Sequence, residues 1–326
     1  MKKLAIAAAA AAALTSGVVN AYETAKFSNG FVVPYVYHNG PNDQTVVGLL
    51  SNGNYAVHWF FYDQDATLQF SGCFVMDANR FLPFEWAKPR HGTAEANVSH
   101  LANVRGYLVF AVGTDSSGTR DTASFKTSCS NPLEFYLPGS TSATGAAQQA
   151  LSGAAFHVRS ASNDVAYVPV INGPLASADS ASLATTANSP VSHVAGAVDG
   201  NDTHFLRFYT AGGAKTEIVI WNSGAYNAGS GSSPNFNKSA TLYQPQGQGL
   251  ASGHPVQLSG LKHRSLNILD PSSPTSIGGV PVSANDGSIR WQPMTSATTQ
   301  GVFTFSVINA PQFGALQTII NPYVRN

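Results

Sequence analysis

The stretch from Thr45 to Met76 constrains the fold of this chain most, because it reads as one strand, a turn and a β-hairpin. Its sequence is TVVGLLSNGNYAVHWFFYDQDATLQFSGCFVM. Apolar runs separated by Asn-Gly and Asp-Gln-Asp are typical of antiparallel strands joined by tight turns. In the run from Tyr55 to Tyr62 both faces of the expected strand are nearly apolar, which predicts a central strand covered on each side. We therefore expect His58, within this run, to be a core histidine.

The outline of this stretch returns in the second half of the chain. TEIVIWNSG starts at Thr216 and matches the strand and turn after Thr45, and SATLYQPQGQGLASGHPVQL starts at Ser239 and matches the hairpin. GVFTFSV from Gly301 echoes GYLVFAV from Gly106. The pattern favours two units of one architecture, the second with Gly- and Ser-rich insertions. The alternative, that any two β-sandwiches rich in Asn-Gly turns resemble one another to this extent, stays open.

The whole chain after its leader has the pattern of an all-β protein. Short runs rich in Val, Phe and Tyr alternate with Asn-Gly, Ser-Gly and Asp-Gly turns. About 305 residues remain after the leader, more than one sandwich of about 100 residues needs. We expect two tandem antiparallel β-sandwich domains, Ig-like or jelly-roll-like, at residues 22–174 and 199–326. The Ala- and Ser-rich residues 175–198 are the expected linker between them.

The first 21 residues, MKKLAIAAAAAAALTSGVVNA, have the features of a secretory signal peptide. Two lysines precede an apolar run from Leu4 to Leu14, and small residues end at Ala21. An apolar run of about 11 residues is too short for a bilayer, which needs about 20. We expect cleavage after Ala21 and export to the periplasm, the outer cell surface or the extracellular space. No later stretch of the sequence is apolar enough to span a membrane.

Cys73 and Cys129 are the two cysteines of the chain. Export would place them in a compartment where disulfides form and persist. We therefore predict a disulfide between them. Two buried free thiols, the alternative, would need the reducing cytosol that the leader argues against.

Charged residues are scarce, and their balance excludes one class of partner. Removal of Lys2 and Lys3 leaves 15 basic and 17 acidic residues, a net charge of −2. The charged fraction is 10%, against roughly 25% in ordinary globular domains. Nucleic acid is not an expected partner, because phosphate binding needs a concentrated basic surface.

A recurring pattern of strand and turn is visible in four segments, VVGLLSNG, VHWFFYDQDA, EIVIWNSG and ATLYQPQGQ. In this pattern the chain resembles a loose group of uncharacterised secreted tandem β-sandwich proteins of Gram-negative bacteria. The resemblance covers most of the mature chain and its motifs are generic. It implies the fold and export, and no activity.

Signatures of common enzymes are absent from the sequence, which contains no Gly-x-Ser-x-Gly, His-Glu-x-x-His, Cys-x-x-Cys, Walker loop or Gly-x-Gly-x-x-Gly. Glu85 and Glu95, near Trp86 and His91, are the best candidates for a pair of carboxylates that could hydrolyse a glycosidic bond. Solvated loop carboxylates are the favoured interpretation. The histidines lie at no metal-ligand spacing, so no metal or cofactor is predicted.

Aromatic side chains are the remaining candidates for binding. Trp86, in a loop context, and Tyr226, in a Gly-rich insertion, are expected to be exposed and available for glycan contact. Other aromatic residues, Tyr35 and Tyr37 among them, fall at strand positions where core packing is expected.

Together these features favour an exported, non-enzymatic surface or extracellular protein that acts through protein or glycan contacts, as an adhesin or a component of a surface structure. Open sheet edges would allow a homo-oligomer or filament. The alternative function is a secreted polysaccharide hydrolase that uses loop carboxylates.

Overall fold

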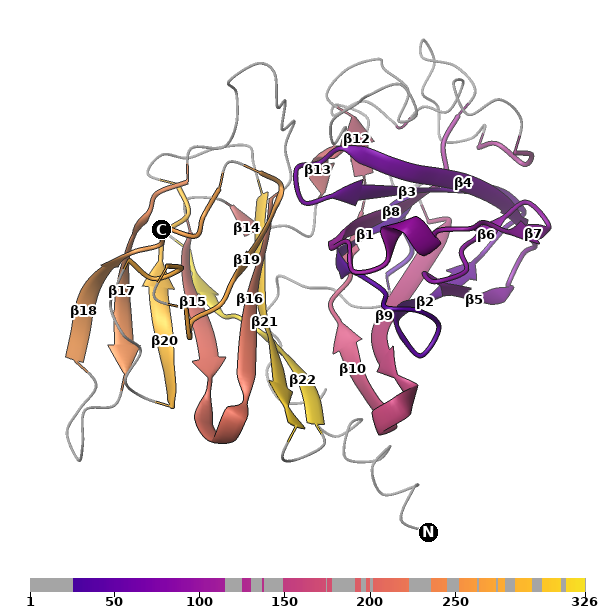
Figure 1. Cartoon of the computed structure of the whole chain (residues 1–326). Coiled ribbons are helices and arrows are strands. Elements are labelled where there is room, and N and C mark those ends of the chain that lie inside the picture. The colour runs from indigo at the N-terminus through magenta and orange to yellow at the C-terminus, as the bar shows by residue number, and fades with distance from the viewer. Residues whose placement is uncertain are drawn as a thin grey trace.

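The protein is described by a computed structural model that covers residues 26–114, 125–129, 137, 149–173, 175–177, 191–194, 198–199, 202–222, 236–244, 252–262, 264–273, 275–278, 285–294, 301–311 and 315–325. Within these residues the chain is all-β, with several antiparallel sheets and only single-turn 3₁₀ helices (Figure 1). None of the helices in the described part is long and apolar enough to cross a membrane.

The N-terminal half of the chain contains two large sheets. Sheet I has the order β10 (Asp164–Val168), β9 (Leu151–Arg159), β2 (Asp43–Ser51), β5 (Phe81–Glu85). Sheet II has the order β11 (Ile171–Asn172), β1 (Gly30–Val36), β8 (Gly106–Ala111), β3 (Tyr55–Asp63), β4 (Leu68–Met76). A small hairpin, β6 (Arg90–His91) with β7 (Ala94–Glu95), lies between β5 and β8 in the sequence.

The C-terminal half contains two more large sheets. Sheet III has the order β14 (Val198–Asp199), β21 (Gly301–Ala310), β16 (Lys215–Asn222), β19 (Leu266–Leu269), and β22 (Ala315–Ile320) also pairs with β21. Sheet IV has the order β18 (Ser252–Gln257), β17 (Ser239–Gln244), β20 (Asp286–Trp291), β15 (Thr203–Tyr209), β23 (Tyr323–Val324).

The two halves share one strand order. In sheet I, β2 pairs with β5 and β9, and β9 pairs with β10; in sheet III, β16 pairs with β19 and β21, and β21 pairs with β22. In the same way β1-β8-β3-β4 of sheet II corresponds to β15-β20-β17-β18 of sheet IV. The expected match of Gly301 with Gly106 is wrong. Gly301 starts β21, the counterpart of β9, whereas the counterpart of β8 is β20.

A pair of side-chain hydrogen bonds also recurs in the two halves. Thr45 Oγ1 accepts a hydrogen bond from the amide of Tyr37 at 3.2 Å and donates to its carbonyl at 3.3 Å. Thr216 Oγ1 makes the same two contacts with Tyr209, at 3.0 and 2.6 Å. In each half the threonine therefore fastens the strand that precedes it by the same pair of bonds, which agrees with the sequence match of Thr45 to Thr216.

Most strands of the N-terminal half lie where the sequence predicts them. The hairpin of β3 and β4 turns after Asp63, whose Oδ1 accepts hydrogen bonds from the amides of Asp65 (2.9 Å) and Thr67 (3.0 Å). β3 lies between β8 and β4 and is buried along nearly its whole length, as expected for a strand covered on both faces. His58 is 2% exposed, which confirms a core histidine.

The predicted disulfide between Cys73 and Cys129 is present, with the two Cα atoms 5.7 Å apart. It fastens β4, an edge strand of sheet II, to residues 125–129. Two short strands, β12 (Leu175–Ser177) and β13 (Val191–Val194), pair within residues 175–198. Most of the described part of the expected linker thus forms a small sheet of its own, and its last residue, Val198, pairs with Val302 of β21.

Apolar side chains pack between the sheets in two core clusters. Sheets I and II share one cluster, in which Phe84 of β5 packs edge-on against Phe110 of β8 with ring centroids 4.9 Å apart. Sheets III and IV share a second cluster, which contains Ile218 and Ile220 of β16 and Ile289 of β20. Ile218 and Ile220 are two residues apart on β16 and so point to the same side of sheet III, as β geometry requires.

The two halves are in apolar contact with each other. Trp221 of β16 is fully buried and meets Tyr107 of β8 edge-on, with ring centroids 5.9 Å apart. Phe305 of β21 meets Tyr35 of β1 in the same way at 6.3 Å. Sheet II is therefore covered by sheet I on one face and by sheet III on the other, which explains why β1 and β8 are buried at every position.

Candidate functional site

A pocket lies where the two halves meet, with a volume of about 270 Å³. Both halves supply its walls, through β1, β9 and β10 on one side and β16, β21 and β22 on the other. Its lining residues are Tyr35, Tyr37, Arg105, His157, Arg159, Ala166, Val168, Lys215, Glu217, Val307, Asn309, Leu316 and Thr318.

Three polar side chains join the two halves at the pocket. The Tyr35 hydroxyl donates to Glu217 Oε2 at 2.6 Å, and Arg105 Nη2 donates to Glu217 Oε1 at 2.7 Å. Arg105 Nε also lies 3.4 Å from the Tyr35 hydroxyl. The pairing of β1 with β8 shifts register between Val33 and Val36, in the stretch that carries Tyr35. Such an irregularity re-aims side chains, and this one directs Tyr35 toward Glu217.

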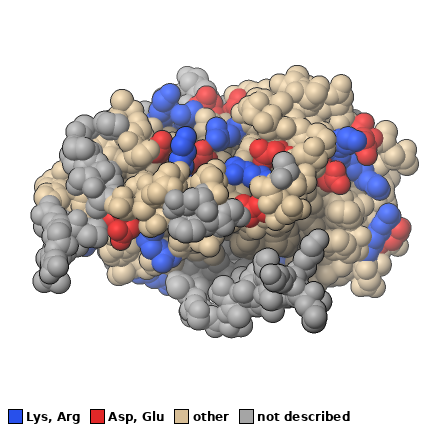
Figure 2. All heavy atoms as spheres, turned by 60° about the horizontal axis from the view of Figure 1, so that its bottom comes forward, with Lys and Arg blue, Asp and Glu red and all other residues tan. Residues whose placement is uncertain are grey.

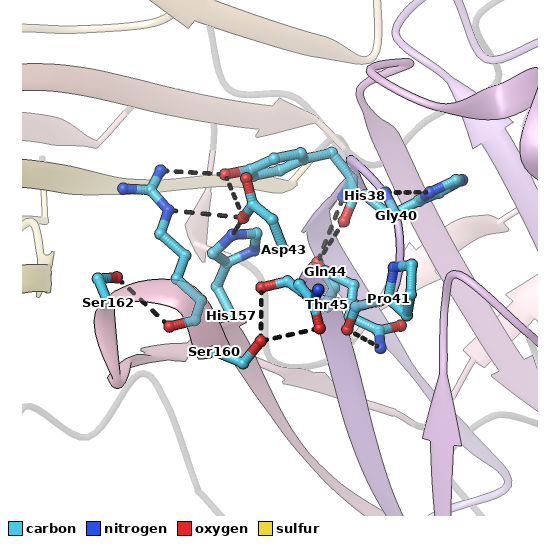
Figure 3. A network of polar contacts seen from close by, with 12 residues as sticks. His38, Gly40, Pro41, Asp43, Gln44, Thr45, His157, Ser160 and Ser162 are labelled. Carbon is cyan, nitrogen blue, oxygen red and sulfur yellow. Dashed lines mark hydrogen bonds and ion pairs between the residues drawn. The ribbon is translucent and has the colours of Figure 1, made fainter.

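A second polar group lies on the N-terminal side of the pocket. His157 Nε2 and Asp43 Oδ1 are 2.7 Å apart and point toward each other (Figure 3). Arg159 Nε lies 3.5 Å from the same Asp43 oxygen, and Arg159 Nη2 donates to the Tyr37 hydroxyl at 3.2 Å. The Tyr37 ring stacks on His157 with centroids 4.3 Å apart, while Arg105 lies 5.6 Å from the centre of the Tyr37 ring.

Burial governs the protonation of these groups. It lowers the pKa of His157 even though the hydrogen bond to Asp43 acts in the opposite direction. Burial also raises the pKa of Tyr35 far above its usual range, and the negative charge of Glu217 adds to this. Near neutral pH the imidazole and the phenol are therefore both uncharged. With Nε2–H donating to the Asp43 carboxylate, His157 Nδ1 is an acceptor.

Three buried polar atoms of described residues that line the pocket have no hydrogen-bond partner: His157 Nδ1, Arg159 Nε and Thr318 Oγ1. Of these, Arg159 Nε lies in an ion pair with Asp43, whereas His157 Nδ1 and Thr318 Oγ1 are unsatisfied. Lys215 is exposed and forms no ion pair within the described part of the chain. The pocket therefore offers donors, an acceptor and a positive charge that the protein itself does not use. Figure 2 shows one face of the molecule, on which acidic and basic side chains lie interspersed in small groups among uncharged residues.

The predicted exposure of Trp86 is wrong. Its side chain is fully buried, and its indole ring packs on Phe61 with centroids 4.3 Å apart and meets Trp59 edge-on at 6.2 Å. The residue follows β5 directly, so its side chain continues into the core between sheets I and II. Tyr226, the other predicted glycan contact, lies outside the described residues.

The carboxylates singled out in the sequence lie away from this pocket. Glu85, at the end of β5, is exposed, with Oε2 3.5 Å from Gln44 Nε2. Glu95 is exposed on β7. Neither residue lines the pocket. The described residues contain no group of three His, Cys, Asp or Glu side chains placed to bind one metal ion.

Tyr35 and Tyr37 are predicted core residues, and no motif in the sequence marks the other members of the two polar groups at the pocket: Asp43, Arg105, His157, Arg159 and Glu217. A local signal exists in the alternation of His157 and Arg159 on β9, because polar residues two apart share one face of a strand. That signal does not show that these two residues line one pocket with Glu217, more than fifty residues further along the chain.

Comparison with known proteins gives no family. No family model matches the chain. No curated protein matches it either. Among solved structures, a lectin from Pleurotus ostreatus in complex with GalNAc is 7% identical, over 93% of this chain and 83% of the lectin, with a TM-score of 0.15. A likeness at that TM-score carries no argument about the fold or the ligand.

Proposed function

We propose that this chain is an exported, non-enzymatic protein of two tandem β-sandwich domains that binds a glycan in the pocket between them. The observation that carries the proposal is the pair of unsatisfied polar atoms, His157 Nδ1 and Thr318 Oγ1, on opposite walls of this pocket. A buried polar atom without a partner costs roughly 1–3 kcal/mol, and a ligand that hydrogen-bonds to it recovers that energy.

The mixture of side chains in the pocket matches the chemistry of a sugar. Hydroxyl groups of a sugar both donate and accept hydrogen bonds, and Lys215, Glu217 and Asn309 offer both functions. Val168 and Leu316 line the same pocket and suit the apolar C–H faces of the ring. The volume lies slightly below the usual range of about 300–1,000 Å³ for small-molecule sites. A single sugar unit at the end or branch of a glycan fits this size better than a long chain.

The carboxylates at the pocket are engaged in ways that favour binding over catalysis. Glu217 accepts hydrogen bonds from Tyr35 and Arg105, and Asp43 is held by His157 and Arg159. A glycosidase would need one carboxylic acid able to give its proton to the leaving oxygen. Both carboxylates at the pocket are already engaged by these side chains of the protein, which is why the non-enzymatic function is preferred to the hydrolase.

Export rests on the leader sequence, and the Cys73–Cys129 disulfide is compatible with an oxidising compartment outside the cytosol. The tandem arrangement of two domains rests on the common strand order of the two halves. From these features we place the protein at the cell surface or outside the cell, where glycans are abundant.

A glycan array with the intact, processed protein tests the proposal. Asn309→Phe places a large ring at the pocket wall, and Asn285→Phe makes the same change at an exposed turn that does not line the pocket. We expect a defined set of glycans to be bound by the wild-type protein and by Asn285→Phe, and the signal to be lost in Asn309→Phe. An array without any signal, or a signal that survives in Asn309→Phe, would remove the pocket as the binding site.

A further inference from the structure

The outward face of sheet I is apolar. Leu50, Phe81, Phe156 and Val165 are 36%, 66%, 38% and 56% exposed. They come from all four strands of the sheet, and the strand register joins Leu50 to Phe81 directly. Among the described strand residues on this face, Glu85 is the charged one, and its charge is negative.

Such a face is unusual for a protein that stays monomeric. An antiparallel sheet with one solvated face normally alternates apolar and polar residues. Contiguous apolar surface of more than a few hundred Å² marks an interaction site in most soluble proteins. We therefore interpret the outward face of sheet I as an interaction surface, and the C-terminal half of the molecule indicates what binds to it.

The C-terminal half shows what covers the corresponding face. By strand order and register, Leu50 and Phe81 correspond to Trp221 and Leu266 of sheet III. These two residues are 0% exposed, because sheet II packs on them, with Tyr107 against Trp221. Sheet III is the counterpart of sheet I. Within one molecule its outward face is thus covered by the outward face of sheet II.

The outward face of sheet IV is covered by no other sheet of the described part of the chain. Sheet IV is the counterpart of sheet II, and Ile289 and Trp291 of β20 point into the core between sheets III and IV. Arg290, between them, is exposed on the opposite, outward face, and its ladder neighbour on β17 is Thr241. Arg207 and Asp286 share this face by register, so together with Arg290 they give it a net charge opposite to that of Glu85 on sheet I.

We propose that sheet I of one molecule packs face to face on sheet IV of a second copy of this chain, repeating the contact that sheets II and III make within the molecule. The contact joins two different surfaces, so each added copy leaves one sheet I and one sheet IV free. A head-to-tail contact of this kind builds an open chain of subunits unless its rotation closes a ring.

Two blocked variants test the contact. Phe81→Lys with Val165→Lys charges sheet I, and Thr241→Glu with Arg290→Glu charges sheet IV; all four side chains lie at exposed or half-exposed positions. Val75→Lys is the matched control, because Val75 is 47% exposed on β4, outside both faces. Circular dichroism and thermal unfolding establish that each variant is folded.

Sedimentation at increasing protein concentration gives the readout. We expect wild-type protein and Val75→Lys to form a growing series of oligomers, each blocked variant alone to associate at least tenfold more weakly, and an equimolar mixture of the two to stop at a dimer. A monomeric wild-type protein at high concentration would overturn the proposal. Self-association of the sheet IV variant into a dimer would also overturn it, because it would mean that sheet I packs on sheet I.

Discussion

At the scale of single residues, His204 shows what burial does to an ionisable side chain. It lies on β15 and is 0% exposed; Nδ1 is 3.0 Å from Thr304 Oγ1, and Nε2 has no hydrogen-bond partner among the described residues. Burial lowers the pKa of His204 from 6.5 to about 4. The folded state therefore holds a neutral imidazole at a pH where the unfolded chain is already protonated.

This difference predicts a loss of stability in acid. The contribution of His204 is fully present above pH 6.5 and is lost as the pH falls toward 4, because the unfolded state takes up the proton first. Between pH 7 and pH 4.5 the free energy of unfolding should fall by about 2 kcal/mol through this residue. Denaturant titrations of wild-type protein and His204→Asn at both pH values measure it. The variant should lose correspondingly less stability on acidification; an equal loss in both proteins would show that other groups cause the effect.

At the scale of elements, the strands of the N-terminal half follow from local pattern, whereas their assembly does not. The alternation and turns from Thr45 to Met76 predict β2, β3 and β4 closely, because strand and turn chemistry act between near neighbours. The match of Gly301 to Gly106 failed for a physical reason. Both strands are buried on both faces, so they carry the same apolar pattern although they occupy different sheets.

The candidate site was less predictable than the strands. Trp86 looked like a loop residue because the sequence loosens after it, yet the residue completes the core beneath β5. Arg105 and Glu217 meet only because sheet II packs on sheet III. Contacts between distant faces leave no periodic signal in the sequence, so the pocket could not be found from it.

The disulfide between Cys73 and Cys129 links β4 covalently to residues 125–129. It closes a loop with a sequence separation of 56 residues. In the loop-entropy model, such a cross-link stabilises the folded state by about 4 kcal/mol. The double variant Cys73→Ser, Cys129→Ser should lose about that much free energy of unfolding, measured by denaturant titration. A loss well below 1 kcal/mol would mean that residues 125–129 are held to β4 by other contacts.

At the scale of the whole molecule, an apolar interface joins the two halves. One core cluster contains residues of sheets I and II together with Val219, Trp221 and Phe303 of sheet III. The ion pair of Arg105 with Glu217 is partly exposed, at 41% and 31%, and adds little to stability by itself. Apolar burial is therefore the main stabilising contact between the halves, and the ion pair fixes how the walls of the pocket meet.

This interface predicts that the halves unfold together. Calorimetry of the intact protein should give a single transition, because unfolding one half would expose the apolar face of the other. Trp221→Ala should cost about 3–5 kcal/mol and shift that transition to lower temperature. Two well-separated transitions in the wild-type protein would show that each half is stable alone and that the interface is weak.

The central claim is that the pocket between the halves binds a glycan, and a calorimetric titration with a glycan identified on the array tests it most directly. We expect saturable binding at one site per chain, a dissociation constant at least tenfold higher in Asn309→Phe, and unchanged affinity in Asn285→Phe. Equal affinity of Asn309→Phe and the wild-type protein for that glycan would contradict it.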